Sequence, residues 1–196
     1  MTTIAVVYHS GFGHTEKQAQ AVAEGAGGVA GAKAILVPVA EAEARFDEIS
    51  AADAIVFGTP TYMGGVSGPF KTFMDATSKI WYGRGWKDKV AAGFTNSASQ
   101  SGDKLNSLVQ LAIFAAQHGM IWVGLDLLPG NNNSKGSTAD LNRLGSFLGA
   151  MAQSNADEGP DKGPIASDLE TAKVLGKRVA EKAAVFAAAK RETVDA

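Results

Sequence analysis

The residues best suited to hold a charged ligand stand near the start of the chain, in the run Ser10-Gly11-Phe12-Gly13-His14-Thr15. This run follows an apolar, β-branched stretch and precedes a polar, alanine-rich helical pattern that begins near Glu16. A loop between a strand and a helix presents free backbone N–H groups at the positive end of the helix dipole. The two glycines let the backbone curl close to a ligand, and the Ser, His and Thr side chains add hydrogen-bonding groups. We therefore predict an anion site that holds the phosphate of a small cofactor.

Two further polar loops follow apolar runs later in the chain, at residues 60–65 and 96–102, and both are rich in Gly, Ser, Thr or Asn. Ligands of parallel α/β sheets bind beyond the carboxyl ends of the strands, so all three loops are expected at one edge of the sheet. The pattern Ser-x-x-Gly-x-Thr alone is common by chance. The agreement of three loops therefore carries the prediction of a ligand site.

Strand-like apolar runs alternate with helical patterns through most of the chain. The predicted strands are residues 3–8, 34–39, 54–58 and 89–94, and a fifth opens at 120–123. The predicted helices are residues 15–25, 46–51, 69–78 and 103–118, the last with Leu105, Leu108, Leu111 and Ala112 facing inward. This alternation predicts an α/β fold, a doubly wound parallel sheet with helices on both faces. A length of 196 residues suits one domain over residues 1–196.

The alternation breaks after the fifth strand opens. Residues 126–138 contain Pro129-Gly130 and three successive asparagines, which is typical of a loop. Residues 146–153 fit a strand or a helix, and their position before the Gly/Pro-rich loop 154–165 favours a strand that completes the interrupted fifth one. Ser167 and Asp168 are candidate caps for a last helix that runs to about residue 190.

Composition narrows the classes of function. The chain is 45% hydrophobic and 19% charged, with a net charge of −2 and no basic block, which argues against nucleic-acid and membrane partners. Because there is no cysteine, thiolate catalysis, disulfides and cysteine-ligated metals are excluded. No signal-peptide pattern or membrane-spanning run is visible, so we expect a cytoplasmic protein.

Three motifs carry a resemblance to a known family. They are residues 8–15 (YHSGFGHT), 57–65 (FGTPTYMGG) and 117–120 (QHGM). They resemble the WrbA family of NAD(P)H:quinone oxidoreductases, which bind FMN and have a flavodoxin-like fold. The resemblance implies a five-stranded parallel sheet of order 2-1-3-4-5 in a three-layer αβα arrangement. Flavodoxins are themselves examples of the rule that ligands bind at strand carboxyl ends.

The resemblance also assigns roles to residues. It implies that FMN is bound by Ser10, Gly11, Phe12, Gly13, His14 and Thr15 at its phosphate, and by Pro60, Thr61, Tyr62, Met63 and Gly64 at its ring. It further implies contacts from Asn96, Ser97, Ala98, Ser99, Gln100 and Gly102 to the ring and ribityl chain, and from His118 at the flavin edge. Phe12 and Trp81 match positions beside the nicotinamide and substrate sites. The flavin itself would carry the chemistry, without a metal or a catalytic side chain, His118 being the one candidate. A homodimer or homotetramer is also implied.

Plainer roles exist for several of these residues. His14 could satisfy a backbone group, and Tyr62 and Met63 could fold onto the core. His118 could serve the C-terminal dipole of its helix, and Trp81 could pack under a loop or form a subunit contact.

Three functions remain in competition. The first is an enzyme that passes electrons from NAD(P)H through FMN to quinones or similar planar acceptors. The second is a flavodoxin-type electron carrier, a class that is usually strongly acidic, whereas this chain has 20 acidic and 18 basic residues. The third is a cofactor-free regulatory domain, which would need clustered carboxylates at the end of the first strand. None is present there, where the residues are Tyr8-His9-Ser10.

Overall fold

The computed structural model describes residues 1–194, and its centre is a mainly parallel sheet. The strands are β1 (Thr2–Tyr8), β2 (Ala32–Pro38), β3 (Ala54–Tyr62), β4 (Gly65–Val66), β5 (Val90–Ser97), β6 (Ile121–Trp122) and β7 (Ala150–Gln153). The helices are α1 (His14–Gly27), α2 (Val39–Ala42), the 3₁₀ helix η1 (Glu43–Arg45), α3 (Phe46–Ala51), α4 (Gly68–Ala76), α5 (Ser78–Tyr82), α6 (Lys104–Gln117) and α7 (Ala166–Val194).

The order of the sheet is β2-β1-β3-β5-β6, and neighbouring strands along this path are parallel. β4 is only a short antiparallel partner of the end of β3. When β5 is counted as the fourth main strand, this is the predicted order 2-1-3-4-5. The predicted flavodoxin-like α/β fold is confirmed.

The fifth strand is interrupted, as the sequence indicated. β6 pairs with the first residues of β5, Val90 and Ala91. β7 pairs with the last four, from Phe94 to Ser97. The favoured assignment of 146–153 as a strand is correct for residues 150–153. Because β7 completes the edge, the loop that follows it emerges at the same end of the sheet as the loops after β1, β3 and β5.

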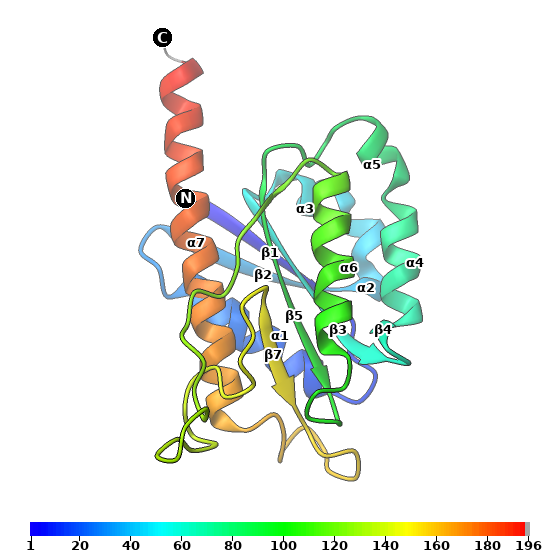
Figure 1. The fold of residues 1–196 in the computed structure, drawn as a ribbon. Coiled ribbons are helices and arrows are strands. Elements are labelled where there is room, and N and C mark those ends of the chain that lie inside the picture. The colour runs from blue at the N-terminus through cyan, green and yellow to red at the C-terminus, as the bar shows by residue number, and fades with distance from the viewer. Residues whose placement is uncertain (195–196) are drawn as a thin grey trace.

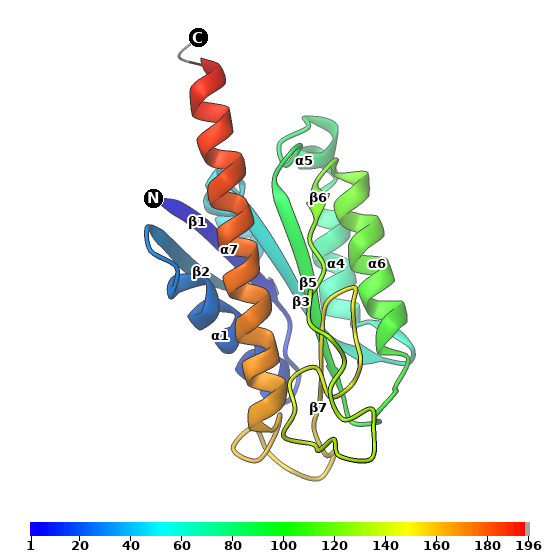
Figure 2. The same ribbon diagram turned by 60° about the vertical axis from the view of Figure 1, so that its left-hand side comes forward.

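Helices cover both faces of the sheet, which gives three layers (Figures 1 and 2). α1 and α7 pack together on one face over a core that includes Ile4, Val56 and Leu175. The other face is covered by the helices from α2 to α6 over an aromatic core that includes Phe57 and Trp86. In Figure 1 the arrowheads of β5 and β7 point to the bottom of the view, and α5 lies at the opposite end.

One prediction about the inward face of α6 is wrong. Leu108 and Leu111 are fully buried, but Leu105 is 58% exposed. The buried face continues through Phe114 and Ala115, one turn further along the helix. Leu105 belongs instead to an exposed apolar row with Val109 and Ile113, at a spacing of four residues. Three leucines in one helix matched an inward stripe, and only the packing shows which two point to the sheet.

The predicted caps of the last helix have other partners. α7 begins at Ala166. The Ser167 hydroxyl donates to the carbonyl of Thr138, and the Asp168 carboxylate forms a buried bidentate ion pair with Arg143. These two side chains therefore tie the start of α7 to the long segment between β6 and β7.

Candidate functional site

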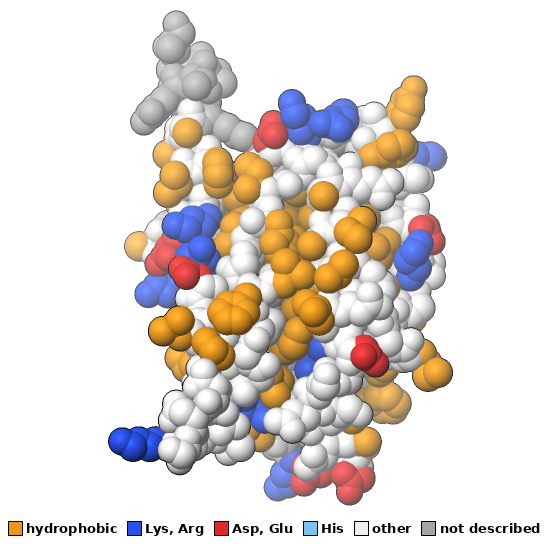
Figure 3. All heavy atoms as spheres, viewed as in Figure 1, with side chains coloured by type: hydrophobic (Ala, Val, Ile, Leu, Met, Phe, Trp, Pro, Cys, Tyr) orange, Lys and Arg blue, Asp and Glu red, His pale blue; other side chains and the backbone are white. Residues whose placement is uncertain are grey.

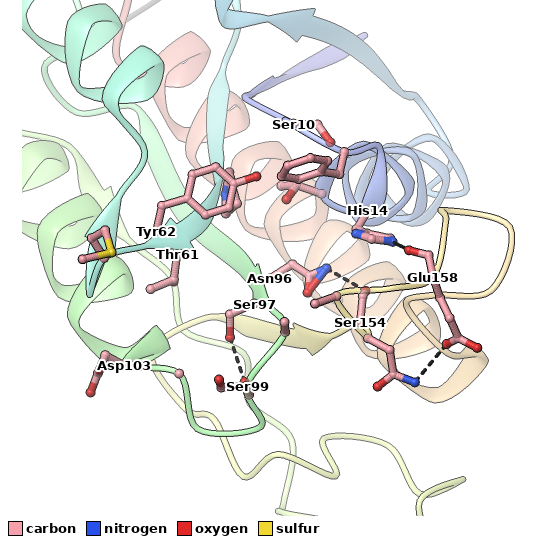
Figure 4. Close-up of a pocket in the computed structure, with 18 of the residues that line it drawn as sticks. Ser10, His14, Thr61, Tyr62, Asn96, Ser97, Ser99, Asp103, Ser154 and Glu158 are labelled. Atoms are coloured by element: carbon pink, nitrogen blue, oxygen red, sulfur yellow. Dashed lines mark hydrogen bonds between the residues drawn. The ribbon is translucent and has the colours of Figure 1, made fainter.

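A pocket of about 630 Å³ opens at the carboxyl edge of the sheet, a volume typical of small-molecule sites. It is formed by the loops after β1, β3, β5 and β7 (Figure 4). The predicted residues that line it are Ser10, Phe12, His14, Thr15, Pro60, Thr61, Tyr62, Met63, Gly64, Asn96, Ser97, Ala98, Ser99 and Gly102. Three loops that are far apart in sequence thus meet at one site.

One end of the pocket is the start of α1. Gly13 is the N-cap residue, with a φ of 89° in the left-handed region that favours glycine, and it has no side chain that could cap the helix. Ser10 Oγ accepts a hydrogen bond from the backbone N–H of Glu16 at 3.1 Å. The first N–H groups of a helix have no intrahelical partner, so this end is suited to an anion. Gly11 and Gly13 belong to this loop although they do not line the pocket.

The second wall is the turn between β3 and β4. Its shape depends on left-handed backbone at Met63 (φ 48°) and Gly64 (φ 82°). Asn106 of α6 donates from Nδ2 to the Gly64 carbonyl at 2.6 Å and holds the turn in place. Below it, Thr61 Oγ1 lies 2.8 Å from Thr95 Oγ1, a buried contact between adjacent strands. A fixed scaffold therefore supports the exposed turn.

Aromatic side chains stand at the mouth of the pocket. Phe12 is 74% and Tyr62 is 40% exposed, and their rings meet edge to face with centroids 6.4 Å apart. Figure 4 shows the Tyr62 ring reaching across toward the Ser10 loop. Met63 is fully exposed beside them. Tyr62 and Met63 thus line the pocket and do not fold onto the core.

The floor contains an unpaired polar atom. Asn96 is 3% exposed, and its Nδ2 donates to Ser154 Oγ at 2.8 Å. Among the described residues, its Oδ1 atom has no hydrogen-bond partner. A buried acceptor without a donor costs free energy, and Asn96 Oδ1 is chemically suited to accept a hydrogen bond from a ligand N–H group.

The fourth loop was not predicted to belong to the site. The additional lining residues are Asp103, Ser154, Asn155, Ala156, Glu158 and Gly159. His14 Nε2 donates to the Glu158 carbonyl at 2.9 Å and so joins the first loop to the fourth. The available signal was the strand assignment for 146–153. Once the fifth strand ends at residue 153, its following loop must reach the same edge as the other three.

The structure does not bring His118 to the pocket within one chain. His118 follows α6, which begins at the pocket and extends ~20 Å away from it at 1.5 Å per residue. His118 is 3% exposed, and its Nε2 lies 2.9 Å from Thr77 Oγ1. Its ring packs on the Trp86 ring, with the two centroids 4.5 Å apart. Burial lowers the pKa of His118 to about 4. The expected approach of His118 to the flavin edge does not fit this position.

Trp81 and Gln100 also lie outside the pocket. Trp81 is 41% exposed on α5, at the opposite end of the molecule from the pocket loops (Figure 1). Gln100 lies within the loop 96–102 but lines a separate groove beside α6. A strand-end rule places loops at an edge, but it does not decide which side of a loop each residue faces.

The fold and the pocket define a flavodoxin-like protein with a small-molecule site at its strand carboxyl ends. The family model described as NADPH-dependent FMN reductase matches residues 13–132. The chain is 48% identical over 184 residues to flavodoxin FldP of Pseudomonas aeruginosa, which covers 92% of this chain and 96% of that protein. It is 35% identical over 203 residues to an NAD(P)H dehydrogenase (quinone) of Archaeoglobus fulgidus, over 92% and 97% of the two chains.

A solved structure supports the same assignment. The crystal structure of a flavodoxin, WrbA-like protein from Agrobacterium tumefaciens matches with a TM-score of 0.74 and 44% identity, over 95% of this chain and 99% of that one. The chain therefore belongs to the NADPH-dependent FMN reductase family, and its resemblance to WrbA-like proteins is confirmed. Within residues 1–194, no helix has the length and apolar character needed to cross a membrane.

Proposed function

We propose that the protein binds FMN in this pocket and uses it to pass electrons from NAD(P)H to quinones or similar planar acceptors. The observation that carries the proposal is the pocket itself. It combines a helix start with a glycine at the N-cap, suited to a phosphate, with an unpaired buried acceptor and an aromatic mouth for a ring. The similarity to an NAD(P)H dehydrogenase (quinone) supports the proposal that the electron acceptor is a quinone.

The residues present fit FMN. The start of α1, with Ser10 and Thr15, would hold the phosphate. Asn96 Oδ1 would accept from the ring N–H, and Tyr62 would shield the ring from water. FMN supplies the hydride and electron chemistry when bound, and the protein supplies position and electrostatics. No side-chain nucleophile is needed for this reaction.

A flavodoxin-type carrier is the second candidate, because the chain is 48% identical to flavodoxin FldP. The near balance of 20 acidic and 18 basic residues favours the enzyme. Electron carriers are usually strongly negative, and this charge attracts them to basic partner proteins. Both candidates require FMN, and they differ in what reduces it.

Two measurements test the proposal. Purified protein mixed with FMN should show bound-flavin absorbance and quenched flavin fluorescence. If neither signal is seen, the enzyme and the carrier hypotheses are both wrong. Stopped-flow mixing of the FMN-loaded protein with NADH and with NADPH should bleach the flavin rapidly. Bleaching only after a separate reductase is added would identify a carrier.

Self-association is part of the same proposal. Apolar side chains gather on the face between α6 and α7 (Figure 3). Leu105, Ile113 and Phe147 are each about 60% exposed there, at 58%, 61% and 61%. Exposed apolar patches of this kind are suited to a subunit contact. Light scattering across a concentration series would reveal the predicted homodimer or homotetramer.

A further inference from the structure

Lys104 is the most unusual charged residue beside the pocket. It is the first residue of α6 and only 1% exposed. Its Nζ donates three hydrogen bonds, to Ser97 Oγ at 2.7 Å and to the carbonyls of Ser99 and Gln100 at 2.8 Å each. An ammonium group has three donors, so one short loop uses all of them.

These contacts fix the loop that lines the pocket. Ser97 and Ser99 both line it, and Ser97 Oγ also donates to the Ser99 carbonyl at 2.9 Å. Gly102 closes the loop at a φ of 55°, where a Cβ atom would overlap Ser97 Oγ. Lys104 thus holds the loop from behind, on the side away from the pocket.

The positive charge of Lys104 is not neutralised by an ion pair within residues 1–194, because its three bonds are to neutral oxygens. The nearby buried charges, Arg143 and Asp168, neutralise each other in a bidentate pair with N–O distances of 2.8 and 2.7 Å. Lys104 therefore adds a positive charge behind the pocket wall that the Arg143–Asp168 pair does not cancel. Burial of a charge without a counterion is costly, and such sites are often functional.

The lysine is nevertheless charged near neutral pH. Burial lowers its pKa to about 8, with Asp168 opposing and Arg143 reinforcing the change. At pH 7 the charged form then exceeds the neutral form by roughly ten to one. Lys104 therefore presents a positive charge to the loop that lines the pocket, at Ser97 and Ser99.

We propose that Lys104 is a positioning residue for the flavin-binding loop, and that its charge favours binding of reduced over oxidised FMN. The inference rests on the FMN function proposed above. FMN takes up two electrons and one proton to give a reduced form that carries an extra negative charge near neutral pH. A buried cation attracts that charge more strongly than water-exposed cations do.

The test compares three variants in the FMN-loaded protein. Lys104→Met keeps the length of the side chain without its charge, and Lys104→Arg keeps the charge. Lys87→Met removes one charge from an exposed lysine near Gly119, at the far end of α6. For each, the dissociation constant of oxidised FMN is measured by fluorescence quenching, and the midpoint potential is measured against a reference dye.

We expect Lys104→Met to weaken the binding of reduced FMN about tenfold more than it weakens the binding of oxidised FMN. For a two-electron couple, this ratio corresponds to a midpoint potential ~30 mV more negative than that of the wild type. Lys104→Arg and Lys87→Met should stay near the wild-type potential. If Lys104→Met does not fold, Lys104→Gln provides a smaller neutral side chain with an N–H donor, and the same shift is expected.

Equal weakening of both FMN forms in the neutral variant, with an unchanged potential, would show a purely structural lysine and overturn the inference while leaving the FMN function intact. A wild-type protein that binds no FMN would overturn both.

Discussion

The contact between α1 and α7 offers a direct test of the packing that positions the pocket, because α1 begins at the pocket and lies along α7. Gly176 of α7 faces the backbone of α1. A Cβ atom there would overlap the Val22 carbonyl oxygen and lie 2.8 Å from its carbon and 3.0 Å from the Ala26 nitrogen. Backbone atoms cannot rotate away as side chains do, so Gly176→Ala must push the helices apart.

The expected loss of stability follows from two opposing effects. Overpacking a close-packed contact costs ~1–3 kcal/mol, and the rigid backbone here places Gly176→Ala near the upper value. The higher helix propensity of alanine offsets ~1 kcal/mol of this loss. The net loss in the free energy of unfolding is ~2 kcal/mol. With a urea m-value of ~2 kcal/mol/M, the unfolding midpoint should fall by ~1 M.

Gly27→Ala is the matched control. Gly27 is also helical, at the end of α1, but a Cβ atom there meets nothing within 4 Å. This variant should be as stable as wild type or gain up to ~1 kcal/mol. Urea titrations followed by circular dichroism measure both. Equal midpoints for the two variants would refute the close approach of α1 and α7.

Two more predictions concern the pocket and the core. Ser10→Ala and Thr15→Ala should each weaken FMN binding by ~1.5–3 kcal/mol, because on the proposed function each would remove a hydrogen bond to a charged phosphate. FMN titration of these variants, with the exposed Ser78→Ala as control, checks this prediction. An unchanged affinity would remove the phosphate assignment. His118 has a folded-state pKa of about 4 against 6.5 for an unperturbed histidine, so the unfolded chain binds more protons between these values. The contribution of His118 to the free energy of unfolding is therefore complete above pH 6.5. It is lost as the pH falls toward 4, by roughly 3 kcal/mol in total. His118→Gln should flatten the pH dependence of the unfolding free energy in that window, and a profile parallel to wild type would contradict the assignment.

The strands and their loops were predictable because their signals are local, whereas the strand order came from the family resemblance. Apolar runs such as 54–58 and the polar loops that follow them are visible in the sequence, and parallel topology places such loops at one edge. The same reasoning identified the interrupted fifth strand. It did not extend to the fourth loop, because the Gly/Pro-rich composition of 154–165 indicates a loop but not its neighbours.

Side-chain direction was less predictable than the position of a loop. Leu105 satisfied the helical pattern yet faces solvent, and Ser167 and Asp168 had suitable types for caps yet bond to the segment before β7. For Ser167 and Asp168 the competing partners, Thr138 and Arg143, lie 29 and 25 residues away in the sequence. Local propensity cannot weigh a partner that only the folded chain brings near.

The sequence by itself determined the α/β class, the strand-end loops and the family resemblance, since these depend on periodicity and short motifs. Only the tertiary structure decided that His118 lies in the aromatic core and that Lys104 is buried behind the pocket wall. Both residues stand at the ends of the same helix, where a sequence allows exposure or burial equally. The packing of α6 against the sheet and its flanking loops selects between them, because burial is a property of all neighbours together.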